Sequence, residues 1–176
     1  MNKKVLLIGY GNPGRLDDGL GPALSAAVEK LDIPGLTVDA DYQLSIEDAA
    51  AVAQHDVVIF ADADTSGAEP FSFKPVEPVS TLGFSSHSLS PQALMALAVN
   101  LFGAKTKGYI LAIGGYEFNE FGERLSERAR ANLEAALLFI EQFIRQLTSN
   151  KTIPLNPLLY KGGQRGVENL LHVESS

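Results

Sequence analysis

The feature that most constrains the fold is a set of short, continuous apolar runs that end in glycine or polar residues. The strongest are Val5–Ile8, Val57–Ala61 and Tyr109–Ile113. Strands of this kind are buried on both faces, which is typical of parallel sheets covered by helices. Segments with helical spacing of apolar residues lie between them. The sequence therefore predicts an α/β protein, a three-layer sandwich with a mostly parallel twisted sheet and helices on both faces.

The other elements are predicted from weaker local signals. Further strands are expected at Leu36–Val38 and at Phe71–Val76, where prolines favour a sheet edge. Helices are expected at Pro22–Leu31, at 45–53 with Ser45 as N-cap and Asp48 as capping-box acid, at Gln92–Phe102 between Ser90-Pro91 and Gly103, and from Ser126 onward. The buried stripe of the last helix is predicted to consist of Leu133, Leu137, Ile140, Ile144 and Leu147.

Length and composition limit the organisation of the chain. Its 176 residues fit one domain, predicted to cover residues 1–148, with an extended or mobile tail at 149–176. A net charge of -7 disfavours nucleic acid and anionic membranes as partners. The absence of cysteine excludes disulfides and thiolate chemistry, and the first apolar run is too short for a signal peptide. We expect a cytoplasmic monomer.

A glycine motif follows the first predicted strand. Gly9-Tyr10-Gly11-Asn12-Pro13-Gly14 matches the G-x-G-x-x-G pattern of dinucleotide-binding proteins. A pyrophosphate, however, needs a helix N-terminus directly after the glycines. Here residues 15–21 delay the helix, and the carboxylates of Asp17 and Asp18 would repel phosphate. The proline inside the motif also removes a backbone donor. The motif is therefore predicted to serve another purpose.

Three side chains are candidate metal ligands. Asp18 follows the first strand, Asp62 ends the Val57 strand, and His87 lies in a polar loop before Ser90. Ligands of doubly wound sheets bind beyond the carboxyl ends of the strands, so we expect these side chains to converge. Two facing carboxylates are costly without a cation. With one imidazole they form a set suited to nickel, zinc or manganese, with coordination positions left open.

Each candidate also has a simpler explanation when taken alone. Asp17 and Asp18 could stabilise a helix N-terminus, and Asp62 could cap a turn. A single loop histidine is usually solvated, as we expect of His55, before its strand at the opposite sheet edge, and of His172 in the tail. Only the combination at one edge favours a functional site.

Other side chains and motifs narrow the chemistry. Asp17, Asp64 and Glu117 are spare carboxylates near the same edge, which could support the ligands or replace one of them. The hydroxyl-rich segment 85–88 lacks a G-x-S-x-G elbow, which disfavours a Ser-His-Asp hydrolase. No H-E-x-x-H motif of the common zinc proteases occurs.

Several segments together resemble the hydrogenase maturation endopeptidases. They are Val5–Pro13 with Asp17–Pro22, which is the most specific, then Asp41–Leu44, the strand ending in Asp62, Ser86–Pro91, and Gly115–Phe118 before Gly122. The similarity covers residues 3 to about 147, and the tail departs from the family pattern. In that family, an acidic residue after the first strand, an aspartate after the third and a loop histidine contact nickel. They match Asp18, Asp62 and His87, although position 18 is glutamate in some members.

The resemblance implies a metal-dependent endopeptidase. It would recognise nickel already placed in the precursor of a nickel–iron hydrogenase large subunit and remove the C-terminal peptide of that precursor. Asp18 and Asp62 are the candidates for general base. Nickel would arrive with the substrate, so we expect no tightly held metal, and zinc or cadmium could occupy the site in crystals. The alternatives are a non-catalytic metal-binding chaperone or sensor and a nucleotide-binding Rossmann-like protein.

Overall fold

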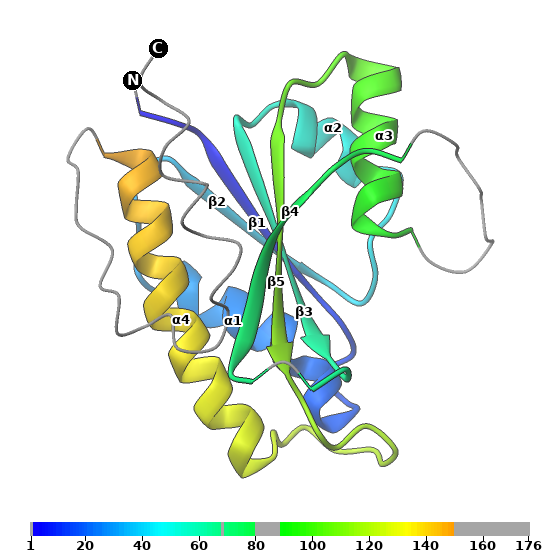
Figure 1. Ribbon diagram of the computed structural model, residues 1–176, viewed down its shortest axis with the longest axis vertical. Helices are drawn as coiled ribbons and strands as arrows, with labels where there is room; N and C mark the ends of the chain where they lie inside the picture. The colour runs from blue at the N-terminus through cyan, green and yellow to red at the C-terminus, as the bar shows by residue number, and fades with distance from the viewer. Residues whose placement is uncertain (1, 68, 80–88, 150–176) are drawn as a thin grey trace.

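The computed structural model describes residues 2–67, 69–79 and 89–149. Its centre is a five-stranded sheet in the order β2-β1-β3-β5-β4 (Figure 1). The strands are β1 (Val5–Tyr10), β2 (Leu36–Asp41), β3 (Val57–Asp64), β4 (Phe71–Val76) and β5 (Lys107–Gly114). Only the edge strand β4 runs antiparallel to its neighbour, β5. The predicted mostly parallel sheet is therefore confirmed, and β4 is the edge strand that its prolines indicated.

Helices cover both faces of the sheet, as expected. A short 3₁₀ helix, η1 (Leu16–Gly19), precedes α1 (Leu20–Glu29), and the other helices are α2 (Asp48–Ala53), α3 (Pro91–Phe102) and α4 (Glu127–Thr148). Helices α1 and α4 pack on one face, and α2 and α3 on the other (Figure 1). Within the described ranges, no helix is long and apolar enough to cross a membrane.

The predicted helix caps are present at two helices. The hydroxyl of Ser90 accepts a hydrogen bond from the N–H of Ala93, and Ser126 caps α4 in the same way. Helix α3 ends at Gly103, which adopts the left-handed conformation usual at this position (φ 63°). These caps explain why the sequence predicts the starts of the two helices accurately.

Two helix starts differ from the prediction. Helix α1 begins at Leu20, two residues before Pro22, since proline is tolerated in a first turn. Helix α2 begins only at Asp48 because residues 45–47 form a turn. The Asp48 carboxylate still accepts a hydrogen bond from the backbone N–H of Ser45 at 2.7 Å. This bond is one of the two expected in the predicted capping box, and it forms in the turn that precedes α2.

The buried face of α4 is rotated from the predicted stripe. Leu133, Leu137 and Leu147 are only partly buried at its margin, whereas Ile140 and Ile144 lie in the core as predicted. The buried positions also include Ala129, Asn132, Ala136, Phe139 and Phe143. The two phenylalanines contact an aromatic cluster on β4 and β5, so aromatic packing against the edge of the sheet determines the rotation.

The strand order places a topological switch point between β1 and β3. The chain leaves β1 through α1 to reach β2 on one side, and then returns through α2 to β3 on the other side. The last pair between β1 and β3 joins Gly9 to Ala61, whereas β3 continues to Asp64 beside β5 alone. A crevice is expected where neighbouring crossovers depart in opposite directions. The loop after β1 and the end of β3 border this point.

Helix α1 approaches the switch point closely because it contains Gly21. A Cβ atom on Gly21 would lie 2.4 Å from the carbonyl oxygen of Tyr10 and 2.6 Å from that of Ala61. A Cβ on Gly9 would lie 2.1 Å from the carbonyl oxygen of Gly21. Only glycine at both positions lets the helix backbone touch the sheet. This contact fixes the position of the segment that enters α1.

Candidate functional site

Asp18 lies in η1, in the loop that follows β1. One of its carboxylate oxygens accepts a hydrogen bond from the backbone N–H of Asn12 at 2.9 Å. The turn beneath it requires glycine, because Gly11 has a φ of 138° and a Cβ there would lie 2.1 Å from the carbonyl oxygen of Asp18. The side chain is half-buried. Asp18 is thus held over the glycine turn by the Asn12 N–H.

Asp62 lies near the carboxyl end of β3, on the extension beyond β1. The prediction that the strand ends at this residue is wrong by two positions, because β3 continues to Asp64 and Asp62 pairs with Ala112 of β5. Its carboxylate accepts a hydrogen bond from the N–H of Ala63 at 2.7 Å. Strand alternation places Asp62 on the same face as Phe60, which is the face covered by α2 and α3.

The electrostatics of Asp62 show that the two carboxylates influence each other. Burial raises the pKa of Asp62, hydrogen bonds from the Ala63 N–H and the Tyr10 hydroxyl lower it in part, and the negative charges of Asp18 and Asp64 raise it further. The resulting pKa is about 6. A carboxyl group of this kind ionises about two pH units later than an ordinary aspartate, and a cation beside it would favour ionisation. The charge of Asp18 thus acts on Asp62, and a cation near both carboxylates would relieve this repulsion.

Tyr10 is a residue of this site that the sequence did not single out. It is the last residue of β1, and its hydroxyl donates a hydrogen bond to the Asp62 carboxylate. Burial raises the pKa of Tyr10 above its ordinary value, and the charge of Asp62 and the hydrogen bond to it raise the pKa further. The phenol therefore stays protonated and orients Asp62. Its location inside a glycine motif hid it, because the register between β1 and β3 was needed to bring it beside Asp62.

Asp17 is buried, whereas the sequence suggested a helix-end residue or a spare carboxylate near the metal ligands. The side chain is 0% exposed, and Ser126 donates to it through both its backbone N–H and its hydroxyl, each at 2.7 Å. The backbone N–H groups of Tyr116 and Glu117 donate at 2.8 and 2.9 Å. Burial raises the pKa of Asp17, but these hydrogen bonds outweigh it and hold the pKa below its ordinary value. Both oxygens of Asp17 are thus engaged within the protein.

The remaining predicted residues divide between described and undescribed parts of the chain. Asp64 accepts hydrogen bonds from Ser66, and Glu117 forms an exposed ion pair with Arg124 at 2.9 Å. Asp18 lies near enough to Asp62 for its charge to raise the pKa of that carboxyl, and His87 lies outside the described residues. Within ranges 2–67, 69–79 and 89–149, no group of three or more His, Cys, Asp or Glu side chains could hold a metal ion. The three-ligand site stays a prediction.

In the glycine motif, the backbone N–H groups that would bind a pyrophosphate already have other partners. The N–H of Asn12 binds Asp18, and the N–H of Gly14 binds the side-chain oxygen of Asn12 at 2.9 Å. Gly11 donates its N–H to the carbonyl oxygen of Asp41. The donors of the loop are therefore engaged internally, and η1 separates the glycines from α1, as the sequence indicated.

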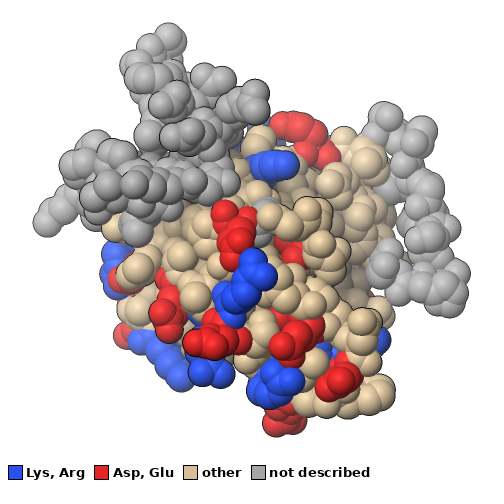
Figure 2. Space-filling model, turned by 60° about the horizontal axis from the view of Figure 1, so that its bottom comes forward, with Lys and Arg blue, Asp and Glu red and all other residues tan. Residues whose placement is uncertain are grey.

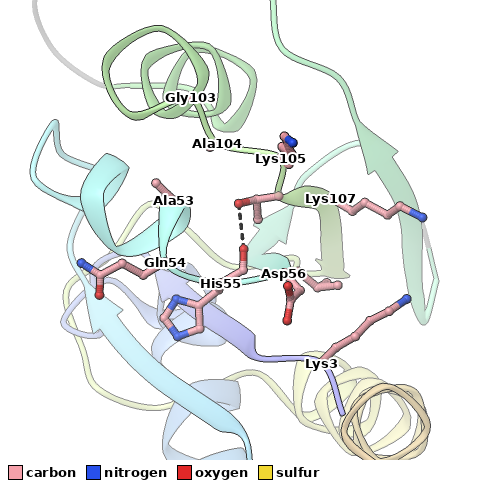
Figure 3. A pocket seen from close by; sticks show the side chains of 11 residues that line it. Lys3, Ala53, Gln54, His55, Asp56, Gly103, Ala104, Lys105 and Lys107 are labelled. Atoms are coloured by element: carbon pink, nitrogen blue, oxygen red, sulfur yellow. Dashed lines mark hydrogen bonds between the residues drawn. The ribbon is translucent and has the colours of Figure 1, made fainter. Parts of the chain in front are cut away.

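A pocket of about 460 Å³ lies at the opposite, amino edge of the sheet (Figure 3). Its lining includes Lys3, Lys105, Lys107 and His55. His55 is engaged there, because its ring nitrogens lie 2.7 Å from the carbonyl oxygen of Ala51 and 2.9 Å from the hydroxyl of Thr37. The prediction that His55 lies away from the candidate site is confirmed, whereas the expectation of a solvated side chain is wrong, because the residue is half-buried and both ring nitrogens have partners. The Asp18–Asp62 site therefore lies apart from this pocket.

The carboxyl edge itself carries charges of both signs. Figure 2 brings this edge forward and shows acidic and basic side chains interspersed over it. Arg15, in the loop after β1, lies 6.0 Å from the ring centre of the exposed Phe121. Long-range attraction at this edge is consequently weak, and recognition there depends on close contacts.

Comparison with known proteins identifies solved structures of the same fold. Hydrogenase maturation protease HycI from Thermococcus kodakarensis is 21% identical, with a TM-score of 0.64 over 81% of this chain and 94% of that one. The endopeptidase HybD from Escherichia coli is 18% identical, with a TM-score of 0.60 over 81% and 93%. An uncharacterised Wolinella succinogenes protein is 26% identical, with a TM-score of 0.57 over 82% and 99%. No protein-family model and no curated sequence matches the chain. The fold expected from the resemblance is confirmed.

Proposed function

We propose that this protein is a hydrogenase maturation endopeptidase, which removes the C-terminal peptide from the precursor of a nickel–iron hydrogenase large subunit. The observation that carries the proposal is the pair Asp18 and Asp62 at the switch point of the sheet, where the pKa of Asp62 reaches about 6 partly because of the charge of Asp18. The fold is shared with solved endopeptidases of this kind, which supports the same activity here.

In the proposed reaction, Asp18, Asp62 and His87 contact nickel that the precursor already carries. Binding of a cation would relieve the repulsion between the two carboxylates. This relief of repulsion would favour binding of a nickel-loaded substrate. Nickel so bound would supply Lewis-acid activation of the scissile carbonyl or of an attacking water. Tyr10 and the Ala63 N–H hold Asp62 in place. Either Asp18 or Asp62 would accept the proton of the water, and a pKa of about 6 suits Asp62 to this role near neutral pH.

The position of α3 supports the inclusion of His87. The residue precedes the Ser90 cap of α3 by three positions in the sequence. Asp62 points toward the sheet face that α3 covers, by strand alternation from the buried Phe60. A ligand delivered by the segment before α3 would complete a two-carboxylate, one-imidazole set.

The proposal is tested by incubating the purified protein with nickel-loaded and nickel-free precursor and measuring peptide release by mass spectrometry. Release from the nickel-loaded precursor alone is expected for the wild type, and Asp18→Asn, Asp62→Asn and His87→Ala should abolish it. His55→Gln is the matched control, because His55 lies at the opposite edge, and it should cleave normally. Normal cleavage by any of the three site variants would contradict the assigned roles.

The same experiment separates the proposal from its rivals. A metal-binding chaperone or sensor with the same ligands would bind the precursor without releasing a peptide. A nucleotide-binding protein would instead bind NAD or FAD, which calorimetry at micromolar concentration detects. Neither result is expected.

A further inference from the structure

The residue before Asp18 connects the candidate site to a distant part of the chain. Asp17 is fully buried, and its carboxylate accepts hydrogen bonds from Tyr116, Glu117 and Ser126. The bond to the N–H of Ser126 spans 109 positions in the sequence. All the donors lie in the loop between β5 and α4 or at the start of α4. One carboxylate thus joins η1 to the loop between β5 and α4.

Backbone hydrogen bonds reinforce this junction. The N–H of Leu16 donates to the carbonyl oxygen of Gly122 at 2.9 Å, and the N–H of Gly122 donates to that of Gly14 at 2.8 Å. The N–H of Asp17 donates to the carbonyl oxygen of Glu117 at 3.0 Å. The loop after β1 and the loop after β5 therefore form one paired structure, with the Asp17 carboxylate at its buried centre.

This junction determines where Asp18 can lie. On one side the Asn12 N–H binds the Asp18 carboxylate, and on the other the peptide group that joins Asp17 to Asp18 is anchored through the buried Asp17 side chain. A short 3₁₀ helix has little rigidity of its own, so these external bonds supply it. Loss of the Asp17 charge would leave donors of Tyr116, Glu117 and Ser126 without a full acceptor.

We propose that Asp17 is a positioning residue, whose buried carboxylate holds η1 against the β5–α4 loop and thereby places Asp18 opposite Asp62. The inference rests on the proposed function for its catalytic consequence, but the placement of Asp18 is a structural statement that can be measured separately. Asp17 touches neither substrate nor metal in this scheme. It acts through Asp18.

The test compares Asp17→Asn with the wild type in two measurements at a temperature where both are folded. In the processing assay, kcat is expected to fall roughly ten- to a hundredfold with little change in KM, as for a misplaced reacting group. In amide NMR spectra of the same proteins, the Asn12 N–H is expected to shift and to exchange faster, because it reports the bond to Asp18. Asparagine preserves shape while removing the charge.

Controls separate positioning from general stability. Thr106→Val removes a hydroxyl that donates at 2.8 Å to the carbonyl oxygens of Val52 and His55 at the amino edge, so it weakens the fold far from the site. It should leave kcat and the Asn12 resonance unchanged. If Asp17→Asn does not fold, Ser126→Ala removes one donor to the same carboxylate and should produce smaller changes in the same direction.

The outcomes are distinguishable. If the variants lose thermal stability while kcat and the Asn12 resonance stay as in the wild type, Asp17 only supports the fold and the inference is overturned. If the wild type fails to cleave any precursor, the proposed function fails, whereas the NMR comparison still decides whether Asp17 places Asp18.

Discussion

Replacing Asp62 by asparagine is expected to stabilise the metal-free protein at pH 7 while removing its activity. The pKa of this carboxyl rises from its ordinary 3.8 to about 6, chiefly because the group is buried. The rise corresponds to about 3 kcal/mol at neutral pH, since a tenfold change in an equilibrium constant is about 1.4 kcal/mol. Asparagine carries no charge, and its side-chain oxygen can still accept the hydrogen bond from the Ala63 N–H. A net gain of about 1–3 kcal/mol is therefore expected.

The gain should depend on pH in a defined way. Below about pH 4 the carboxyl is protonated in both the folded and the unfolded protein, so the charge has no effect on the free energy of unfolding. Between about pH 4 and pH 6 the unfolded chain ionises first, and the wild type loses stability relative to the variant. Above about pH 6 the difference should be complete and constant.

Urea denaturation in the presence of a chelator measures this difference across the pH range. The exposed carboxylate of Asp39 offers a matched control, and Asp39→Asn should change the free energy of unfolding by less than about 0.5 kcal/mol. If Asp62→Asn is no more stable than the wild type at pH 7, or if its advantage is the same at about pH 4, the electrostatic strain assigned to the site does not exist.

Further predictions concern the scaffold around the site. Gly21→Ala should lower the free energy of unfolding by roughly 3 kcal/mol or more, because its Cβ would lie 2.4 Å from a backbone oxygen of Tyr10. In the same urea titration, the control Gly103→Ala should lower it by only about 1 kcal/mol, because a Cβ there meets no atom within 4 Å. Stability should fall as the pH drops below about 4, because the pKa of Asp17 is held below its ordinary value, and Asp17→Asn should reduce this acid dependence in denaturation curves. Ser90→Ala removes the acceptor at the start of α3 and should lower the free energy of unfolding by about 1 kcal/mol.

Much of the fold was predictable because its signals are local. Apolar runs marked the buried strands, and Ser90, Ser126 and Gly103 marked helix ends through hydrogen bonds and backbone conformations that span only a few residues. The predictions of the start of α1 and of the buried face of α4 were less accurate. Close approach of Gly21 to the sheet and aromatic packing around Phe143 determine these two features, and both involve segments distant in sequence.

The sequence by itself determined which residue types could serve the candidate site and at which edge of a parallel sheet they would lie, because strand polarity follows from the alternation of strands and helices. Only the tertiary structure decided that Asp17 turns inward to Ser126 while the charge of Asp18 acts on Asp62, and that Tyr10 binds Asp62. Neighbouring aspartates look alike in a sequence. The buried role of Asp17 arises from a partner, Ser126, that the folded chain brings from 109 positions away.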